Sequence, residues 1–259
     1  MIRHLRRAAV GPALAMLALG MAGSAIVTPA MAAGTDSPCA APDSLAFVDA
    51  PLPQVAKKLR AQQPVHLVIY GTSSSMPRSK GLPRSYAAGL QAALESRLPG
   101  ARFVIDNLSQ KTRTATQMAD ALATAVLPAK PDLVLWQTGN VDAAQQIDIN
   151  DFSAALERGI GALRGAGIDA VLIAPQFRMR LSVMVDVAPY DQVMSQLGSA
   201  ETVVVFPRFD IMRHWAEQAV FDNRSDDLAV QMQVAEAENR CLAGLLADMI
   251  VRAAKLPSP

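Results

Sequence analysis

The architecture follows from one stretch, Val65-His66-Leu67-Val68-Ile69-Tyr70-Gly71-Thr72-Ser73-Ser74-Ser75. Its first six residues are apolar apart from His66, and a glycine and a cluster of small hydroxyl residues follow them. This pattern predicts a buried strand that ends in a tight turn. Open α/β folds bind their ligands at the carboxyl ends of the strands. We therefore expect Ser73 at the ligand-binding edge of a sheet, where a serine nucleophile would sit.

The same pattern of a short apolar run followed by a helical segment recurs along the chain. The apolar runs are Val65–Tyr70, Arg102–Asp106, Asp132–Gln137, Asp169–Ala174 and Thr202–Phe206. The helical patterns are Pro53–Ala61, Arg84–Arg97, Thr114–Leu127, Asp151–Arg164, Tyr190–Leu197, Asp210–Gln218 and Asp227–Lys255. Runs that are apolar on both sides are typical of parallel strands covered by helices on both faces. We predict an α/β fold, a three-layer α/β/α sandwich with a five-stranded parallel sheet, in one domain at residues 51–259.

The N-terminus has the pattern of an export signal. Three arginines, Arg3, Arg6 and Arg7, precede a mostly apolar stretch, and Ala30-Met31-Ala32 is a small-x-small cleavage site. We predict a signal peptide over residues 1–32, cut after Ala32, and an irregular lead-in over residues 33–50. The mature chain is then periplasmic or secreted and has no membrane span. An uncleaved anchor is the alternative, because the apolar stretch is long enough to cross a bilayer.

Composition narrows the possible partners. The chain has 24 Lys and Arg against 23 Asp and Glu, so it carries no excess positive charge that would favour nucleic acid. No cluster of Cys and His has the spacing of metal ligands, and we expect neither a metal nor another cofactor. In an oxidising compartment Cys39 and Cys241 are expected to form a disulfide. The alternative is a buried free Cys241 beside a loose Cys39.

Polar residues follow four of the predicted strands, where the loops of a parallel sheet form its active edge. The loops are Gly71-Thr72-Ser73-Ser74-Ser75, Asn107-Leu108-Ser109-Gln110-Lys111-Thr112-Arg113-Thr114, Thr138-Gly139-Asn140-Val141-Asp142 and Pro175-Gln176-Phe177-Arg178. We expect Asp142 and Gln176 to supply polar side chains to a cleft there. The basic residues Arg78, Lys80, Lys111 and Arg113 either line that cleft and attract an anion or are ordinary exposed loop charges.

These loops, in this order, resemble the SGNH (GDSL-like) hydrolase family. The most specific stretches are Ile69-Tyr70-Gly71-Thr72-Ser73-Ser74-Ser75, Pro131-Asp132-Leu133-Val134-Leu135-Trp136-Gln137-Thr138-Gly139 and Asn239-Arg240-Cys241-Leu242-Ala243. The resemblance implies a flavodoxin-like SGNH hydrolase fold and hydrolysis of esters or thioesters, often of acetyl or acyl groups on sugars and lipids. It makes Ser73 the candidate nucleophile, and it puts Thr72, Thr112, Gly139 and Asn140 around an oxyanion hole.

The chain departs from the family pattern at the other catalytic positions. The oxyanion asparagine of the third loop falls on Val141, and Asn140 is one place early. The usual Asp-x-x-His near the C-terminus falls on Val230-Gln231-Met232-Gln233, which has neither the carboxylate nor the imidazole. Of the remaining histidines, His66 lies inside the first strand and is expected to be structural. His214 is the candidate substitute base.

Three interpretations of function follow. In the first, the protein keeps the cleft but has impaired or lost ester hydrolysis, and it binds a small ester, glycan or acyl ligand of the cell envelope, or a protein partner. In the second, it is an active esterase in which Ser73 is served by His214 or by a carboxylate such as Asp142. In the third, it is a purely structural envelope protein, which no sequence feature favours directly.

Overall fold

The structure is a computed structural model that describes residues 39–45, 50–76, 84–179, 184–200, 203–222 and 224–255. The predicted signal peptide and its cleavage site lie outside the described residues, as do Arg78 and Lys80. Most of the lead-in lies outside them too, but Asp43–Leu45 forms a short 3₁₀ turn, η1. None of the described helices combines the length and apolarity needed to cross a bilayer.

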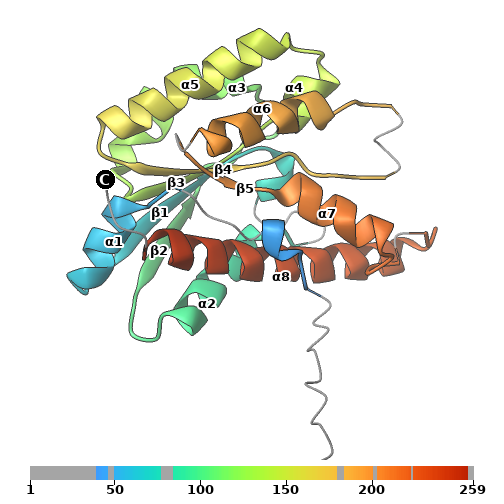
Figure 1. The fold of residues 1–259 in the computed structure, drawn as a ribbon, viewed down its shortest axis with the longest axis horizontal. Helices are drawn as coiled ribbons and strands as arrows, with labels where there is room; N and C mark the ends of the chain where they lie inside the picture. Colours follow the sequence, from blue (N-terminus) through green and yellow to red (C-terminus); the bar gives the residue numbers. More distant parts are fainter. Residues whose placement is uncertain are drawn as a thin grey trace, which may run out of the picture. The chain divides into compact units, whose positions relative to one another are not determined.

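Five parallel strands form one sheet, as predicted, and their order is β2-β1-β3-β4-β5 (Figure 1). The strands are β1 Val65–Tyr70, β2 Phe103–Asn107, β3 Leu133–Gln137, β4 Asp169–Ile173 and β5 Val204–Phe206. The chain moves outward from β1 to β2 and then returns to the other side of β1 for β3. The loops after β1 and β3 therefore separate at their carboxyl ends, where doubly wound sheets open a crevice.

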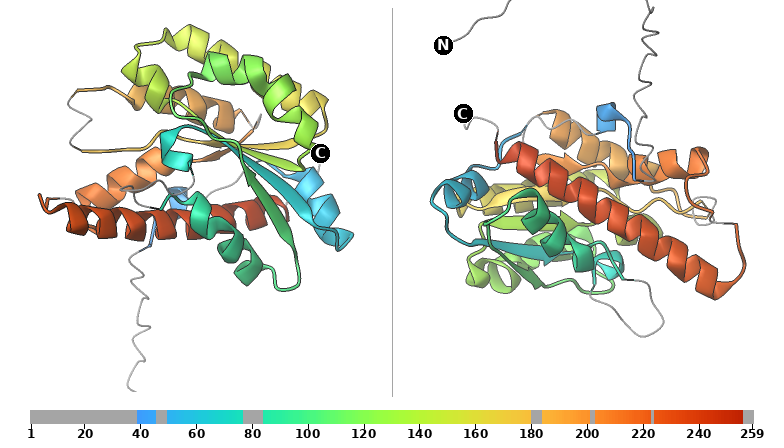
Figure 2. Two further views of the ribbon diagram at one scale, coloured as in Figure 1. Left: turned by 180° about the vertical axis from the view of Figure 1, so that it is seen from behind. Right: turned by 90° about the horizontal axis from the view of Figure 1, so that it is seen from below.

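Helices cover both faces of the sheet, which confirms the three-layer sandwich (Figures 1 and 2). Their bounds are α1 Pro53–Arg60, α2 Ala87–Arg97, α3 Ala115–Ala125, α4 Asn140–Ala144, α5 Ile149–Gly165, α6 Ala188–Ser199, α7 Arg208–Glu217 and α8 Leu228–Ala253, with 3₁₀ turns η2 Ser73–Ser75 and η3 Leu127–Ala129. The sequence pattern missed α4, because five residues are too few to show a helical period.

Successive side chains of each strand point to opposite faces of the sheet, and this alternation divides the core into two clusters. Leu67 and Ile69 of β1 face a cluster to which α1, α2, α7 and α8 contribute. Val68 and Tyr70 face the opposite cluster, beneath α3, α5 and α6. This is the two-residue period of a strand that is buried on both faces.

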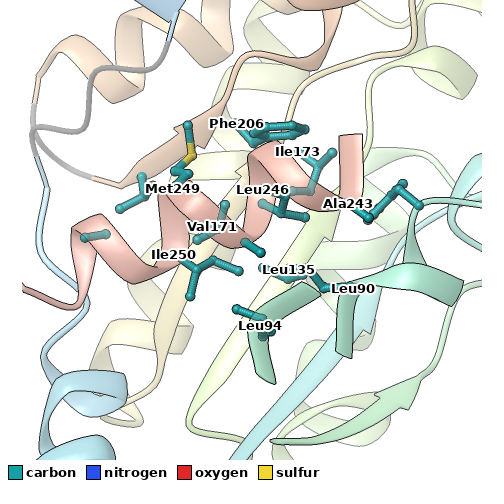
Figure 3. Packing of buried hydrophobic residues seen from close by; sticks show 14 of the residues in the cluster. Leu90, Leu94, Leu135, Val171, Ile173, Phe206, Ala243, Leu246, Met249 and Ile250 are labelled. Carbon is teal, nitrogen blue, oxygen red and sulfur yellow. The ribbon is translucent and has the colours of Figure 1, made fainter. Parts of the chain in front are cut away.

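The long helix α8 closes one face (Figure 3). Leu246, Met249 and Ile250 of α8 belong to the same buried cluster as the side chains of β3, β4 and β5. The predicted disulfide is present, and it joins Cys39 to Cys241 of α8 with their Cα atoms 4.9 Å apart. The indole N–H of Trp215 also donates to the carbonyl oxygen of Ala40, 2.8 Å away, so two contacts hold the start of the described chain against α7 and α8.

On the opposite face, α5 approaches the sheet closely at one glycine. A Cβ atom at Gly159 would lie 2.2 Å from Cζ3 of Trp136, which is fully buried in β3. By contrast, Gly161 on the same helix is exposed, and a Cβ atom there meets nothing within 4 Å. Substitutions at these two glycines therefore distinguish the effect of packing against the sheet from the effect of helix propensity.

We expect Gly159→Ala to lower the free energy of unfolding by about 1–3 kcal/mol, because the added methyl overpacks the core against Trp136. We expect the matched control Gly161→Ala to raise it by about 0.5–1 kcal/mol, the usual gain of alanine over glycine in a helix. Urea denaturation of both variants measures these changes. Equal shifts in the two variants would contradict the close approach of α5.

Candidate functional site

The serine turn after β1 is held by one buried acceptor. Oε1 of Gln137, at the carboxyl end of β3, lies 2.9 Å from both the backbone nitrogen and the hydroxyl of Thr72. The same oxygen lies 3.2 Å from the hydroxyl of Ser74 and 3.1 Å from that of Ser75. The Ser74 and Ser75 hydroxyls therefore point under the turn, whereas Ser73 is the exposed residue of the three.

Ser73 lines a cavity of about 810 Å³ at the carboxyl edge of the sheet. Four of the predicted site residues, Thr72, Thr112, Asn140 and Gln176, line it as well. Much of the remaining wall is apolar and consists of Met76, Val141, Ala144, Phe177, Val187 and Phe209. The rings of Phe177 and Phe209 meet edge to face with their centroids 5.4 Å apart. The cavity thus has a polar end at the serine turn and apolar walls.

The side chain of Asn140 joins the third and fourth loops. Its Oδ1 accepts from the backbone N–H of Gln176 at 2.8 Å, and its Nδ2 donates to the carbonyl oxygen of Gln176 at 3.1 Å. The Asn140 amide is thereby committed to the backbone. At the family's oxyanion position, the structure places the isopropyl group of Val141 on the cavity wall.

A buried arginine lies under the same loops. Arg208, the first residue of α7, is only 1% exposed. Its Nε donates to the carbonyl oxygen of Ala174 at 2.9 Å, and its Nη1 donates to the Ser74 hydroxyl at 3.1 Å. Its Nη2 lies 3.5 Å from Oδ1 of Asn140. Arg208 therefore connects the end of β5 with the loops after β1, β3 and β4.

Burial shapes the electrostatics of Arg208 and of its neighbour Tyr86. Desolvation, together with the positive charge of Arg178, lowers the pKa of Arg208 to about 10, so the guanidinium stays charged near neutral pH. Burial raises the pKa of the Tyr86 hydroxyl, which lies 2.8 Å from the Ser75 hydroxyl. The Arg208 guanidinium is 6.0 Å from the centre of the Tyr86 ring.

The structure places the Asp142 carboxylate beneath the cleft and not on its lining. Asp142 is fully buried and accepts from the Ala115 N–H at 2.7 Å, the Thr138 hydroxyl at 3.0 Å and the Gly139 N–H at 3.1 Å. Burial raises its pKa, and these three donors oppose the shift. Asp142 thus fixes the starts of α3 and α4, and the Gly139 N–H is directed at it.

Gly139 itself has a conformation that favours glycine. Its φ is +96°, and a Cβ atom there would lie 2.6 Å from Cγ of Pro175. Gly139 lets the loop after β3 turn sharply beneath the loop after β4. Its role at the site is therefore to set the backbone conformation of the loop after β3.

Neither described histidine lies on the cavity lining. His66 is near the amino end of β1, where its Nε2 lies 2.9 Å from Oδ2 of Asp106. His214 is half-buried towards the end of α7 and does not line the cavity. The third histidine, His4, belongs to the predicted signal peptide.

The positions of the missing Asp-x-x-His motif lie on the first turns of α8. Val230 and Gln233 are exposed there, and neither lines the cavity. The α8 side chain on the lining is Asn239, about 9 Å further along the helix axis than Gln233. Among the described residues, no group of three or more His, Cys, Asp or Glu could hold a metal ion.

Two basic side chains lie on the wall of the cavity. Lys111 is exposed at the border with a smaller cavity that Arg113 lines. Arg178 lies 4.0 Å from the buried carboxylate of Glu238 on α8. With its amide oriented to satisfy both partners, Oε1 of Gln176 accepts from Nη2 of Arg178 at 2.7 Å.

Gln137 and Arg208 are the site residues that sequence reasoning missed. A signal was available for each of them. Gln137 is a polar residue at the end of the otherwise apolar run Leu133–Gln137, and Arg208 lies two residues beyond the fifth predicted strand. Both residues therefore lie at or just beyond the carboxyl end of a predicted strand, where the loops of a parallel sheet form its active edge.

Comparison with protein families matches residues 38–256 to the model of the non-GDSL lipase-like family. No curated protein matches the chain. Among solved structures, an alpha/beta hydrolase enzyme from the metagenome of Lake Arreo, Spain, is 20% identical, with 70% of this chain and 96% of that one covered and a TM-score of 0.53. A catalytic mutant of the acetylxylan esterase Axe2 from Geobacillus stearothermophilus is 14% identical, with 74% and 95% covered and a TM-score of 0.54. The lipase/acylhydrolase from Enterococcus faecalis is 19% identical, with 68% and 96% covered and a TM-score of 0.51. At these identities the likeness shows a shared fold, the one that the SGNH resemblance implied.

We expect Gln137→Leu to lower the free energy of unfolding by about 2 kcal/mol or more, because the buried N–H and hydroxyl of Thr72 lose their acceptor. The control is Gln176→Leu, which removes an amide whose partner, Arg178, is partly exposed, and we expect it to cost less than about 1 kcal/mol. Thermal and urea unfolding provide the comparison. A smaller effect at Gln137 than at Gln176 would refute the role of the buried acceptor.

Proposed function

This chain belongs to the non-GDSL lipase-like family, and we propose that it binds a small ester, glycan or acyl ligand of the cell envelope in the Ser73 cavity and hydrolyses it slowly or not at all. The cavity volume of about 810 Å³ is in the range of small-molecule sites, which are typically about 300–1,000 Å³. Its apolar walls and the polar end at Ser73 suit an amphiphilic ligand.

The single observation that carries the proposal is the position of the histidines. A serine hydroxyl becomes a useful nucleophile only when a neighbouring base accepts its proton. His66 lies at the other end of β1 from Ser73, and His214 is not on the cavity lining. Gln137 accepts hydrogen bonds from Ser74 and Ser75, but an amide does not take up a proton near neutral pH.

The oxyanion side of the site supports the same conclusion. Val141 offers no donor where the family resemblance expects an amide, and the Asn140 amide is occupied by the backbone of Gln176. Loss of one oxyanion donor typically lowers kcat by about a hundredfold or more. Absence of both the base and this donor favours binding over turnover.

Slow ester hydrolysis by Ser73 is the second candidate, and two observations favour it. The buried charge of Arg208 lies one hydrogen bond from the serine turn, where it favours a developing oxyanion. The carboxylate of Asp186 lines the cavity, whereas that of Asp142 does not. An oxyanion site and binding alone retain some rate over water when triad members are absent.

Turnover of p-nitrophenyl acetate and butyrate by the purified mature protein, beside Ser73→Ala, distinguishes the two candidates. We expect the wild type and the variant to release p-nitrophenol at equal rates, close to that of buffer. A wild-type rate that disappears in Ser73→Ala would establish the esterase in place of the binding protein. His214→Ala and Asp186→Asn would then identify the base.

We also propose that the protein is exported. The Arg-rich start, the apolar stretch and the Ala30-Met31-Ala32 site support a cleaved signal, and the Cys39–Cys241 disulfide suits an oxidising compartment.

Intact-mass measurement of the full-length chain, expressed with its own N-terminus in a bacterial host, tests the export proposal. We expect a periplasmic or secreted species that begins at Ala33 and has no free thiol after unfolding. A full-length species retained in the membrane fraction would show that the segment is an anchor.

A further inference from the structure

We propose that the polar end of the cavity is an anion site, so that the bound ligand carries a carboxylate or phosphate group. Arg178 and Lys111 would contact this group beside the serine turn, and Arg208 would supply positive charge from below. The inference deepens the proposed function and rests on it, because it assumes that the cavity binds a ligand.

The buried charge of Arg208 is the first observation. Its three hydrogen-bond acceptors are neutral: a backbone carbonyl, a serine hydroxyl and an asparagine amide. Among the described residues, no carboxylate lies within ion-pair distance of the guanidinium. Burying a cation without a counter-ion is expensive, and neutral dipoles offset only part of the cost. Ser74, whose hydroxyl accepts from Arg208 under the turn, is a lining residue of the cavity, so the guanidinium lies one residue beneath the cavity wall.

The second observation is that another arginine is close to the first. Arg178 lines the cavity with 39% of its side chain exposed, and its charge is among the causes that lower the pKa of Arg208. The two positive charges repel each other at the edge of a desolvated region. An anion bound there, between the arginines and the solvent, is favoured because it offsets that repulsion. Lys111 adds a third positive charge from the loop after β2.

Two carboxylates face this region, and each already has a partner within the protein. Glu238 lies 4.0 Å from Arg178 and is buried on α8. Asp186 accepts from the backbone N–H of Ala188 at 3.1 Å, where it faces the positive end of α6. The charges of Lys111 and Arg208 are left for a ligand to neutralise.

Four eight-carbon probes test the inference by isothermal titration calorimetry on the mature protein: octanoate, octyl phosphate, octyl glucoside and octylamine. They share an apolar chain and differ in the charge of the head group. We expect one of the two anions to bind at least about tenfold more tightly than the neutral glucoside, and octylamine to bind most weakly. Whichever anion binds more tightly identifies the group as a carboxylate or a phosphate.

Variants that remove one positive charge test whether the preference for anionic probes arises at this end of the cavity. We expect Lys111→Gln and Arg178→Gln each to weaken binding of the preferred anion about three- to tenfold and to leave octyl glucoside unchanged. The matched control is Lys57→Gln, an exposed lysine on α1 near the amino edge of the sheet, which should change neither probe. Because Arg178→Gln leaves Glu238 without this partner, its melting temperature is measured first. If it does not fold, Lys111→Gln alone carries the test.

The outcomes separate the two proposals. Equal affinity for the anions and octyl glucoside would overturn the anion site and leave the binding function intact. An equal loss in Lys57→Gln would trace the anion preference to general surface charge and would also overturn it. If no probe binds, the proposed binding function itself fails, and the anion site fails with it.

Discussion

One buried amide oxygen organises the carboxyl edge of the sheet. Oε1 of Gln137 lies at the end of the central strand β3 and receives the hydrogen bonds of the turn that follows β1. Arg208 donates to the Ser74 hydroxyl, and the Tyr86 hydroxyl contacts that of Ser75. Both serine hydroxyls in turn donate to Oε1 of Gln137. In a low-dielectric interior, such a converging network is stable only when its members are present together. It therefore holds the loops of three strands in fixed positions and leaves Ser73 as the hydroxyl that faces outward.

The fold was predictable because its signals are local and repeated. Each strand is a short apolar run, the helices that precede β2, β3 and β4 end near a proline or glycine, and the right-handed crossover rule leaves few arrangements of five such units. The short helix α4 was not predictable, since its start depends on the positive φ of Gly139 and on a carboxylate, Asp142, that also binds the first turn of α3.

The site was predictable only in part. Thr112, Asn140 and Gln176 line the cavity because their loops follow parallel strands. What these side chains do there depends on contacts between loops that are far apart in sequence. Asn140 pairs with a backbone 36 residues away, and Arg208 reaches a serine 134 residues away. No spacing rule in a single sequence encodes such pairings, which is why the central positions of the network were missed.

The disulfide gives the domain an unusual covalent topology. Cys39 and Cys241 are separated by 202 positions, so the bond turns most of the folded domain into a single ring. A protease that cuts one exposed loop inside this ring would open it without releasing a fragment, and the two pieces would separate only after reduction. The unfolded chain is confined to the same ring, and for a loop of this size the lost entropy is worth about 5.3 kcal/mol in the chain-entropy model. Reduction therefore removes both the resistance to fragmentation and much of the stability margin of the domain.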